Sequence, residues 1–278
     1  MNKNELGKVK AKDVKEIAIE LMKKTRYWAF CVLGITFLLV YVFVVTGGEN
    51  DYLMIFSIIL IMGYIGYIYD KAQAMFMKQF AEDNGFDYQK TASIETVYGK
   101  LFEIGHSRHI SNVISGIHKD HPMRIFNYTF TVGYGRNSQT YSFTVLELFF
   151  EKVDFPHILL RSKKMSVYRG LMGKTESISL EDEFKRDFDF FVQKGYEIEA
   201  MQIFTPETLR IIKEKAAKFS IEFYGKTVCF FDNKKIGKNN DLQELYGVTE
   251  KVFDSMSPLL NRLYDDFKVL HKYYRDKS

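Results

Sequence analysis

Residues 27–46 read YWAFCVLGITFLLVYVFVVT, residues 47–51 read GGEND, and residues 52–69 read YLMIFSIILIMGYIGYIY. Neither apolar run contains a charged residue. As an α-helix, which rises about 1.5 Å per residue, the first run is roughly 30 Å long and the second roughly 27 Å. The hydrocarbon core of a bilayer is about 30 Å thick. The sequence therefore predicts a transmembrane helical hairpin over residues 27–69.

Two other interpretations of this hairpin are weaker. A cleaved signal peptide would explain the first run, but the apolar stretch is longer than the core of a typical signal peptide, and no small-residue cleavage site follows it. A transport path is disfavoured because neither run holds an ionisable residue that could line it. The hairpin is therefore expected to be an anchor.

The distribution of lysine and arginine predicts the orientation of the hairpin. Eight such residues precede the first run, the connection 47–51 has none, and Lys71 and Lys78 follow the second run. By the positive-inside rule both chain ends are expected in the cytoplasm, in a multi-pass protein of the bacterial inner membrane. The predicted membrane-interface residues are Tyr27, Trp28, Tyr52, Tyr67, Tyr69, Lys23, Lys24, Arg26 and Lys71.

The segments on either side of the hairpin both predict helices. Residues 1–26 form a basic segment in which apolar residues recur at helical spacing from Val14 to Met22. This helix is expected either to lie on the inner membrane surface or to pack against the protein itself or an oligomeric neighbour. Residues 70–85 predict a juxtamembrane helix that ends at Asn84-Gly85, a common C-terminal signal.

Residues 86–278 predict a cytosolic domain that is rich in strands. Apolar residues alternate with period two in MRIFNYTFTVGYG (123–135) and TYSFTVLELFF (140–150). Residues 135–138 and Gly225-Lys226 predict hairpin turns. Further strands are expected at residues 112–120, 157–161, 188–192, 197–203, 220–224 and 227–231.

Three helices are expected in the same domain: a short one at about residues 93–102, one at residues 205–219, and one from about residue 241 to 274 with a break near Ser257-Pro258. The predicted fold class is therefore α+β, with an N-terminal two-helix transmembrane hairpin followed by a cytosolic domain. That domain has a mainly antiparallel sheet of about six to eight strands and a long C-terminal helix. A bent sheet closed by that helix would resemble a pleckstrin-homology-type barrel.

Amino-acid composition indicates a folded protein and narrows its possible partners. Aromatic residues make up 16% of the chain and only four residues are proline, which favours a packed core over disorder. The net charge is +4, and no basic motif is interleaved with stacking aromatics, so nucleic acid is not an expected partner. The two cysteines, Cys31 in the first run and Cys229 in a predicted strand, are not expected to meet.

No motif predicts an enzyme or a cofactor. The GKT triplets at 173–175 and 225–227 lack the earlier glycine of a phosphate-binding loop, and no GxSxG or HExxH sequence occurs. Four histidines within sixteen residues are the one weak candidate for a metal site. They are His106, His109, His118 and His121, and ordinary surface or turn positions are the favoured explanation for them.

One segment resembles a known family. In FKRDFDFFVQKGYEIEAMQIFTPETLRII (184–212), a strand with Phe188, Phe190 and Val192 is followed by Glu199-Ala200 and by Thr205-Pro206 opening a helix. This pattern is similar to the bacterial family called domain of unknown function 3137, and the resemblance extends over about residues 80–278. It implies N-terminal membrane spans joined to a cytosolic α+β domain, and it implies no catalytic residue or cofactor.

These observations lead to three hypotheses about function. The favoured one is a membrane-anchored cytoplasmic binding or scaffolding module, without enzymatic activity, whose partners are the lipid bilayer and either another protein or a second copy of the chain. The second is a ligand-triggered effector whose hairpins oligomerise in the membrane. The third is a metal-dependent membrane-bound enzyme that uses the histidine cluster.

Overall fold

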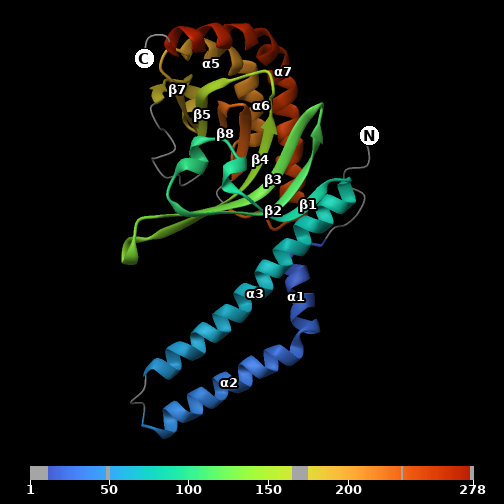
Figure 1. Cartoon of the computed structure of the whole chain (residues 1–278), viewed down its shortest axis with the longest axis vertical. Helices are drawn as coiled ribbons and strands as arrows, with labels where there is room; N and C mark the ends of the chain where they lie inside the picture. Colours follow the sequence, from blue (N-terminus) through green and yellow to red (C-terminus); the bar gives the residue numbers. More distant parts are fainter. Residues whose placement is uncertain (1–11, 48–50, 165–174, 233, 276–278) are drawn as a thin grey trace. The chain divides into compact units, whose positions relative to one another are not determined.

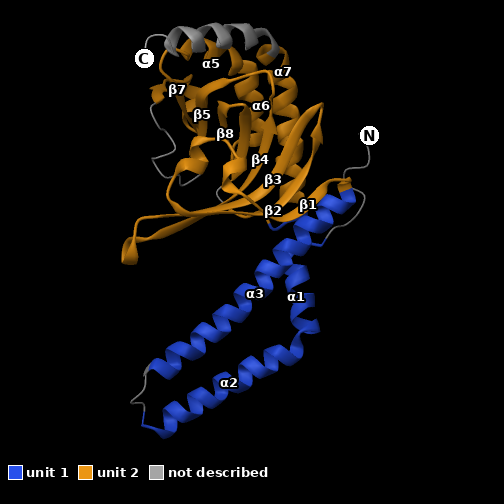
Figure 2. Cartoon of the chain, in the orientation of Figure 1, with its two compact units in different colours: residues 1–83, 237–239 blue, residues 84–236, 240–278 orange. Residues whose placement is uncertain are grey.

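The computed structural model describes residues 12–47, 51–164, 175–232 and 234–275, with side chains described as far as residue 260 (Figure 1). The chain divides into two compact units, which we call unit 1 (residues 1–83 and 237–239) and unit 2 (residues 84–236 and 240–278) (Figure 2). The elements of unit 1 are α1 (Val14–Lys24), α2 (Arg26–Val45) and α3 (Asp51–Asn84).

The elements of unit 2 follow in chain order. They are β1 (Asp87–Ala92), η1 (Ile94–Thr96), η2 (Lys100–Glu103), β2 (His106–His118), β3 (His121–Val132), η3 (Gly135–Asn137), β4 (Gln139–Phe149), β5 (Phe155–Ser162), β6 (Thr175–Ile178), α4 (Asp182–Lys185), β7 (Phe188–Gln193), α5 (Glu197–Ile203), α6 (Pro206–Ala216), β8 (Ser220–Gly225), β9 (Thr227–Asp232) and α7 (Asn239–Arg275), whose first residue belongs to unit 1.

Both apolar runs of unit 1 are helical, as predicted. The first forms α2, and the second forms the beginning of α3, which continues without a break through the predicted juxtamembrane helix. Gly85 follows with a φ of +68°, the left-handed conformation that glycine adopts most easily after a helix. One continuous helix therefore joins the second apolar run to the start of the strand region.

The amphipathic helix α1 also forms as predicted, and its apolar side is buried. Its first turn binds the short segment 237–239. The backbone N–H of Val14 donates to the carbonyl of Gly237 at 2.8 Å, and the Asp13 carboxylate accepts from the backbone N–H of Asn239 at 2.9 Å. These two hydrogen bonds explain why residues 237–239 belong to unit 1.

The described strands of unit 2 form one nine-stranded sheet in the order β1-β2-β3-β4-β9-β8-β5-β7-β6, and all their pairings are antiparallel. The predicted α+β class, antiparallel sheet and C-terminal helix are thus confirmed. The predicted strand number was too low, and the sheet ends at β1 and β6 rather than closing into the barrel used as an analogy. The hairpin β8–β9 lies between β4 and β5.

The hairpin turns follow the local sequence. Lys119 and Asp120 both have positive φ between β2 and β3, as a two-residue primed turn requires. Gly225, with a φ of +56°, begins the predicted turn between β8 and β9. The three-residue element η3 joins β3 to β4 at the position where residues 135–138 predicted a turn.

Three predictions of local structure were wrong. Residues 197–203 form helix α5 rather than a strand, because burying Ala200 and Ile203 requires a spacing of three residues. The short helix over residues 93–102 is two separate 3-10 turns, η1 and η2. Helix α7 continues through Pro258, and Met256 and Leu260 on its two sides are both buried.

Candidate functional site

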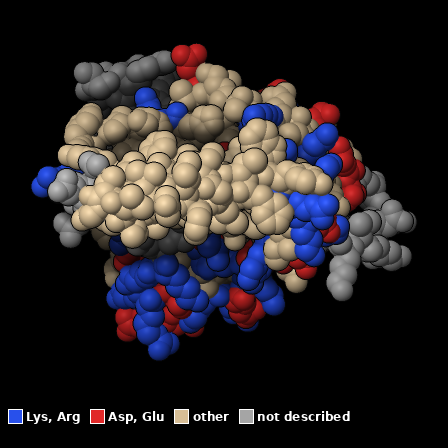
Figure 3. All heavy atoms as spheres, turned by 90° about the horizontal axis from the view of Figure 1, so that it is seen from below, with Lys and Arg blue, Asp and Glu red and all other residues tan. Residues whose placement is uncertain are grey.

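Helices α2 and α3 hold the apolar surface of unit 1. Both are long and apolar enough to cross a membrane, and only 6% and 11% of their most apolar windows are buried. Figure 3 shows this surface as a broad band without acidic or basic residues. A helix from the core of a water-soluble domain would bury such a surface instead.

The predicted interface residues lie at the two ends of this apolar surface. Tyr52 is exposed at the start of α3, beside the connection between the helices. The other predicted residues lie at the opposite end of this surface, where α1 ends, where α2 begins and in the middle of α3. There Thr25 and Tyr64 share a hydrogen bond of 3.0 Å, which fixes the beginning of α2 against α3.

At that end, each helix pairs a cation with an aromatic ring. The Arg26 guanidinium lies 5.3 Å from the centre of the Tyr27 ring on α2. The Lys71 ammonium lies 5.7 Å from the centre of the Tyr67 ring on α3. We call the residues Lys23, Lys24, Arg26, Tyr27, Trp28, Tyr67, Tyr69 and Lys71 the basic collar.

The four candidate metal ligands do not come together. His106 and His109 lie at the start of β2, whereas His118 lies at its end and pairs with His121 across the β2–β3 turn. At about 3.3 Å per residue, the nine steps along β2 from His109 to His118 separate the two pairs by roughly 30 Å. Within the described residues, no group of three or more His, Cys, Asp or Glu side chains could hold a metal. A single site made of all four histidines is therefore wrong.

Each histidine pair has other partners. The His106 ring stacks on Tyr134 with ring centres 4.6 Å apart, and its Nε2 donates to the carbonyl of Gly133. His118 Nδ1 shares a hydrogen bond with the Tyr246 hydroxyl on α7, and His121 packs against Phe150 and Phe253. Burial, and the neighbouring Lys119 charge, lower the pKa of His118 below its ordinary value. These contacts make His118 part of the packing between the β2–β3 turn and α7.

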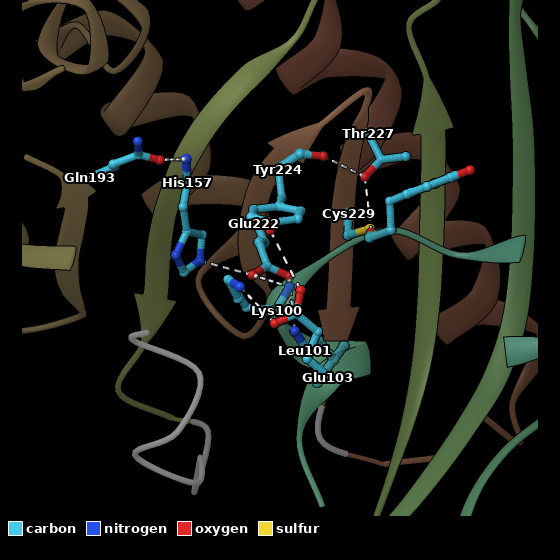
Figure 4. A network of polar contacts seen from close by, with 10 residues as sticks. Lys100, Leu101, Glu103, His157, Gln193, Glu222, Tyr224, Thr227 and Cys229 are labelled. Carbon is cyan, nitrogen blue, oxygen red and sulfur yellow. Dashed lines mark hydrogen bonds and ion pairs between the residues drawn. The ribbon is translucent and has the colours of Figure 1, made fainter. Parts of the chain in front are cut away.

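Unit 2 also holds a buried polar group centred on Glu222, which sequence reasoning missed (Figure 4). The Glu222 carboxylate accepts from the backbone N–H groups of Lys100 and Leu101, at 3.1 and 3.4 Å, and lies 2.9 Å from Nε2 of His157. The side chains of His157 and Glu222 are almost completely buried. Gly99 comes so close that a Cβ there would lie 2.9 Å from the carboxylate.

The strand register extends this polar group across the sheet. Arg124 faces Glu147, Glu147 faces Cys229, and Cys229 faces Glu222 on the strands β3, β4, β9 and β8. Residues directly opposite each other share one face of a sheet, so these four side chains and His157 form a continuous polar row. Arg124 binds Glu147 through Nε at 2.8 Å.

Residues 93–103 cover this polar row. Arg124 donates to the carbonyl and hydroxyl of Thr96, and the Thr227 hydroxyl donates to the carbonyl of Tyr98 at 3.0 Å. The side chains of Leu101 and Phe102 pack into the apolar core. The segment is thus held by hydrogen bonds from Arg124 and Thr227, by the Glu222 carboxylate that accepts from its backbone, and by apolar packing.

The chemistry of the polar row fits a structural clamp. Burial, together with the nearby Glu147 and Glu222, raises the pKa of the Cys229 thiol well above its ordinary value, so the thiolate nucleophile is disfavoured. Burial also raises the pKa of Glu147, and Arg124 opposes that shift. One signal was present in the sequence: Glu147 and Glu222 each lie between two large apolar residues of a predicted strand, where a buried charge needs a partner.

Comparison with known proteins finds a solved structure with a similar fold. No family model matches the chain, and no curated protein matches it, so the resemblance to domain of unknown function 3137 stays a prediction. The crystal structure of the mycobacterial trehalose monomycolate transport factor A is similar, with a TM-score of 0.50 and 12% sequence identity. The match covers 68% of this chain and 94% of that one. At this identity, the likeness extends to the fold alone.

Proposed function

We propose that the protein is a membrane-anchored binding module that α2 and α3 hold in a bilayer. The observation that carries this proposal is the outward-facing apolar surface of these two helices. Exposing so long an apolar surface to water is unfavourable, and such surfaces mark membrane or protein contacts. In the two helical spans, the backbone groups away from the helix ends are paired within the helix, as lipid requires. The basic residues before the first apolar run and after the second support an orientation in the bacterial inner membrane with both chain ends in the cytoplasm.

Cysteine labelling in intact cells tests this anchoring and orientation. In a Cys31→Ser background, the variants Asp51→Cys and Lys90→Cys place a thiol in the loop and on β1. A membrane-impermeant maleimide should label the first variant in cells with a permeabilised outer membrane, and the second only after lysis. The remaining Cys229 is buried and should react slowly in both. Equal labelling before lysis, or recovery of the protein in the soluble fraction, would refute the proposal.

The projecting end of β2, β3 and β4 is the surface that we assign to the partner. These strands are among the longest of the sheet and extend beyond its body to the turn at η3 (Figure 1). Tyr134 at this end is 80% exposed, yet its ring is held flat by stacking on His106. A large, rigid aromatic face loses little conformational entropy on binding, which is why such residues dominate protein interfaces.

Site-specific crosslinking tests this surface. A photoreactive phenylalanine analogue at position 134 should give a discrete adduct in membranes, whereas the same analogue at Tyr98, a second exposed tyrosine, should not. The adduct should have the mass of a second copy of the chain or of one other protein. Adducts of equal yield at both positions, or none at either, would remove this surface from the proposal.

A further inference from the structure

The basic collar concentrates positive charge at one end of the apolar surface. Lys23, Lys24, Arg26 and Lys71 are all exposed there. The acidic side chains nearest to them in sequence are Glu20, which binds Lys12 at 2.5 Å, and Asp70. The collar therefore has more cations than nearby carboxylates to neutralise them.

The opposite end of the same two helices has the reverse composition. Residues 47–51, between the two apolar runs, contain Glu49 and Asp51 but no lysine or arginine. Both ends carry exposed tyrosine, so aromatic content alone does not distinguish them. The difference between the ends is the charge, and only the collar carries an excess of cations.

The collar also has the layered chemistry of a membrane surface. Trp28, Tyr27 and Tyr67 are exposed at the edge of the apolar surface, and the cations of Arg26 and Lys71 lie over the last two of these rings. Indole and phenol rings prefer the headgroup level of a bilayer, where lipid phosphates also lie. Arginine and lysine beside such rings can therefore reach the phosphates while their alkyl chains stay on apolar atoms.

We infer that the basic collar binds the headgroups of anionic phospholipids and gives the protein a preference for them over zwitterionic lipids. This inference rests on the proposed anchoring and adds the lipid class. Each cation near an anionic surface contributes about 1 kcal/mol, which is roughly a fivefold preference. Because surface charges are screened, the preference should weaken as the salt concentration rises.

The chain offers a direct probe of this lipid preference. Trp28 is its only tryptophan, belongs to the collar near the start of α2, and is 72% exposed. Brominated lipids quench tryptophan on contact. The full chain is reconstituted in vesicles that mix brominated phosphatidylglycerol with ordinary phosphatidylcholine, and separately in vesicles with the bromine on phosphatidylcholine. The two quenching curves give the binding constant of the anionic lipid relative to the zwitterionic one at Trp28.

We expect this relative binding constant to be about 5 or more at low salt and to fall severalfold in the double variant Arg26→Gln/Lys71→Gln, which removes two of the four cations of the collar. Lys78→Gln is the matched control, because Lys78 lies on α3 outside the apolar run and pairs with Glu82 at 3.5 Å. It should leave the ratio unchanged.

The outcomes separate the lipid preference from the anchoring. Quenching by both lipids with a ratio near 1 would overturn the inference and leave the anchor intact. A high ratio that the double variant retains would also overturn it, because the collar would not be its source. No quenching by either lipid would refute the proposed anchoring itself.

Discussion

Most apolar side chains of α2 and of the first half of α3 face outward, whereas most of those in the sheet of unit 2 are buried. Phe37 on α2 is 75% exposed, and Phe130 on β3 is completely buried. The polar groups differ in the same sense. The hydroxyls of Thr36 and Ser57 bind carbonyls of their own helices, while Glu222 in the sheet binds groups from distant segments. The arrangement of side chains, rather than their composition, shows which solvent each region requires.

The largest effect is expected from truncating a buried phenylalanine of the sheet, compared with an exposed phenylalanine of α2. Phe130→Ala should lower the free energy of unfolding of unit 2 by about 4 kcal/mol, because a buried ring leaves a cavity. Phe37→Ala should change it by less than about 0.5 kcal/mol, because the Phe37 ring has no packed surroundings to lose. Urea titration of the purified protein in detergent, followed by circular dichroism, measures both. Similar losses of unfolding free energy in the two variants would contradict the proposed difference between the buried and the exposed ring.

A smaller loss is expected when the polar row is broken. Glu222→Ala should destabilise unit 2 by about 3 kcal/mol, because it leaves His157 and two backbone N–H groups buried without their acceptor. Glu222→Gln keeps one acceptor oxygen and should lose less. Glu103→Ala, in an exposed ion pair with Lys100, is the control and should cost no more than about 1 kcal/mol. Comparable losses for Glu222→Ala and Glu103→Ala would show that the row is not a clamp.

The smallest effect concerns pH. The pKa of His118 is lowered in the folded protein, first by burial and then by Lys119, with Glu250 and Asp254 acting in the opposite direction and His121 in the same one. The unfolded chain therefore takes up a proton first, and the contribution of His118 to stability is lost as the pH falls below about 6.5. His118→Gln should flatten the decline in melting temperature between about pH 7 and 5. A parallel decline in both proteins would assign the pH dependence to other groups.

Periodicity in the sequence predicted the elements whose environment is uniform along their length. The runs 27–46 and 52–69 are apolar on every side, and β3 alternates from Phe126 to Phe130, so one period describes each of them. Periodicity could not assign residues 197–203, because EIEAMQI fits both the period of two of a strand and the spacing of three of a helix. Only the packing of Ala200 and Ile203 decides between them.

The polar row could not be predicted from the sequence, for a different reason. Glu222 and its partners at Lys100 and Leu101 are more than 120 residues apart in the chain. No local pattern brings them together, because the contact depends on the order of strands in the sheet. The prediction of a histidine cluster was wrong for the opposite reason: residues close in sequence lie far apart in the structure. The extended strand β2 separates the four histidines into two distant pairs.

The position of β8–β9 in the sheet has a consequence for synthesis of the protein. Strands β4 and β5 are consecutive in the chain, yet residues 220–232 separate them in the sheet. While the ribosome adds the roughly 70 residues from the end of β5 to the end of β9, at about 5–20 residues per second, both strands keep an unpaired edge for roughly 4–14 s. The nascent chain thus holds two half-sheets that cannot merge until the last hairpin emerges, and this interval is when a chaperone would be needed most.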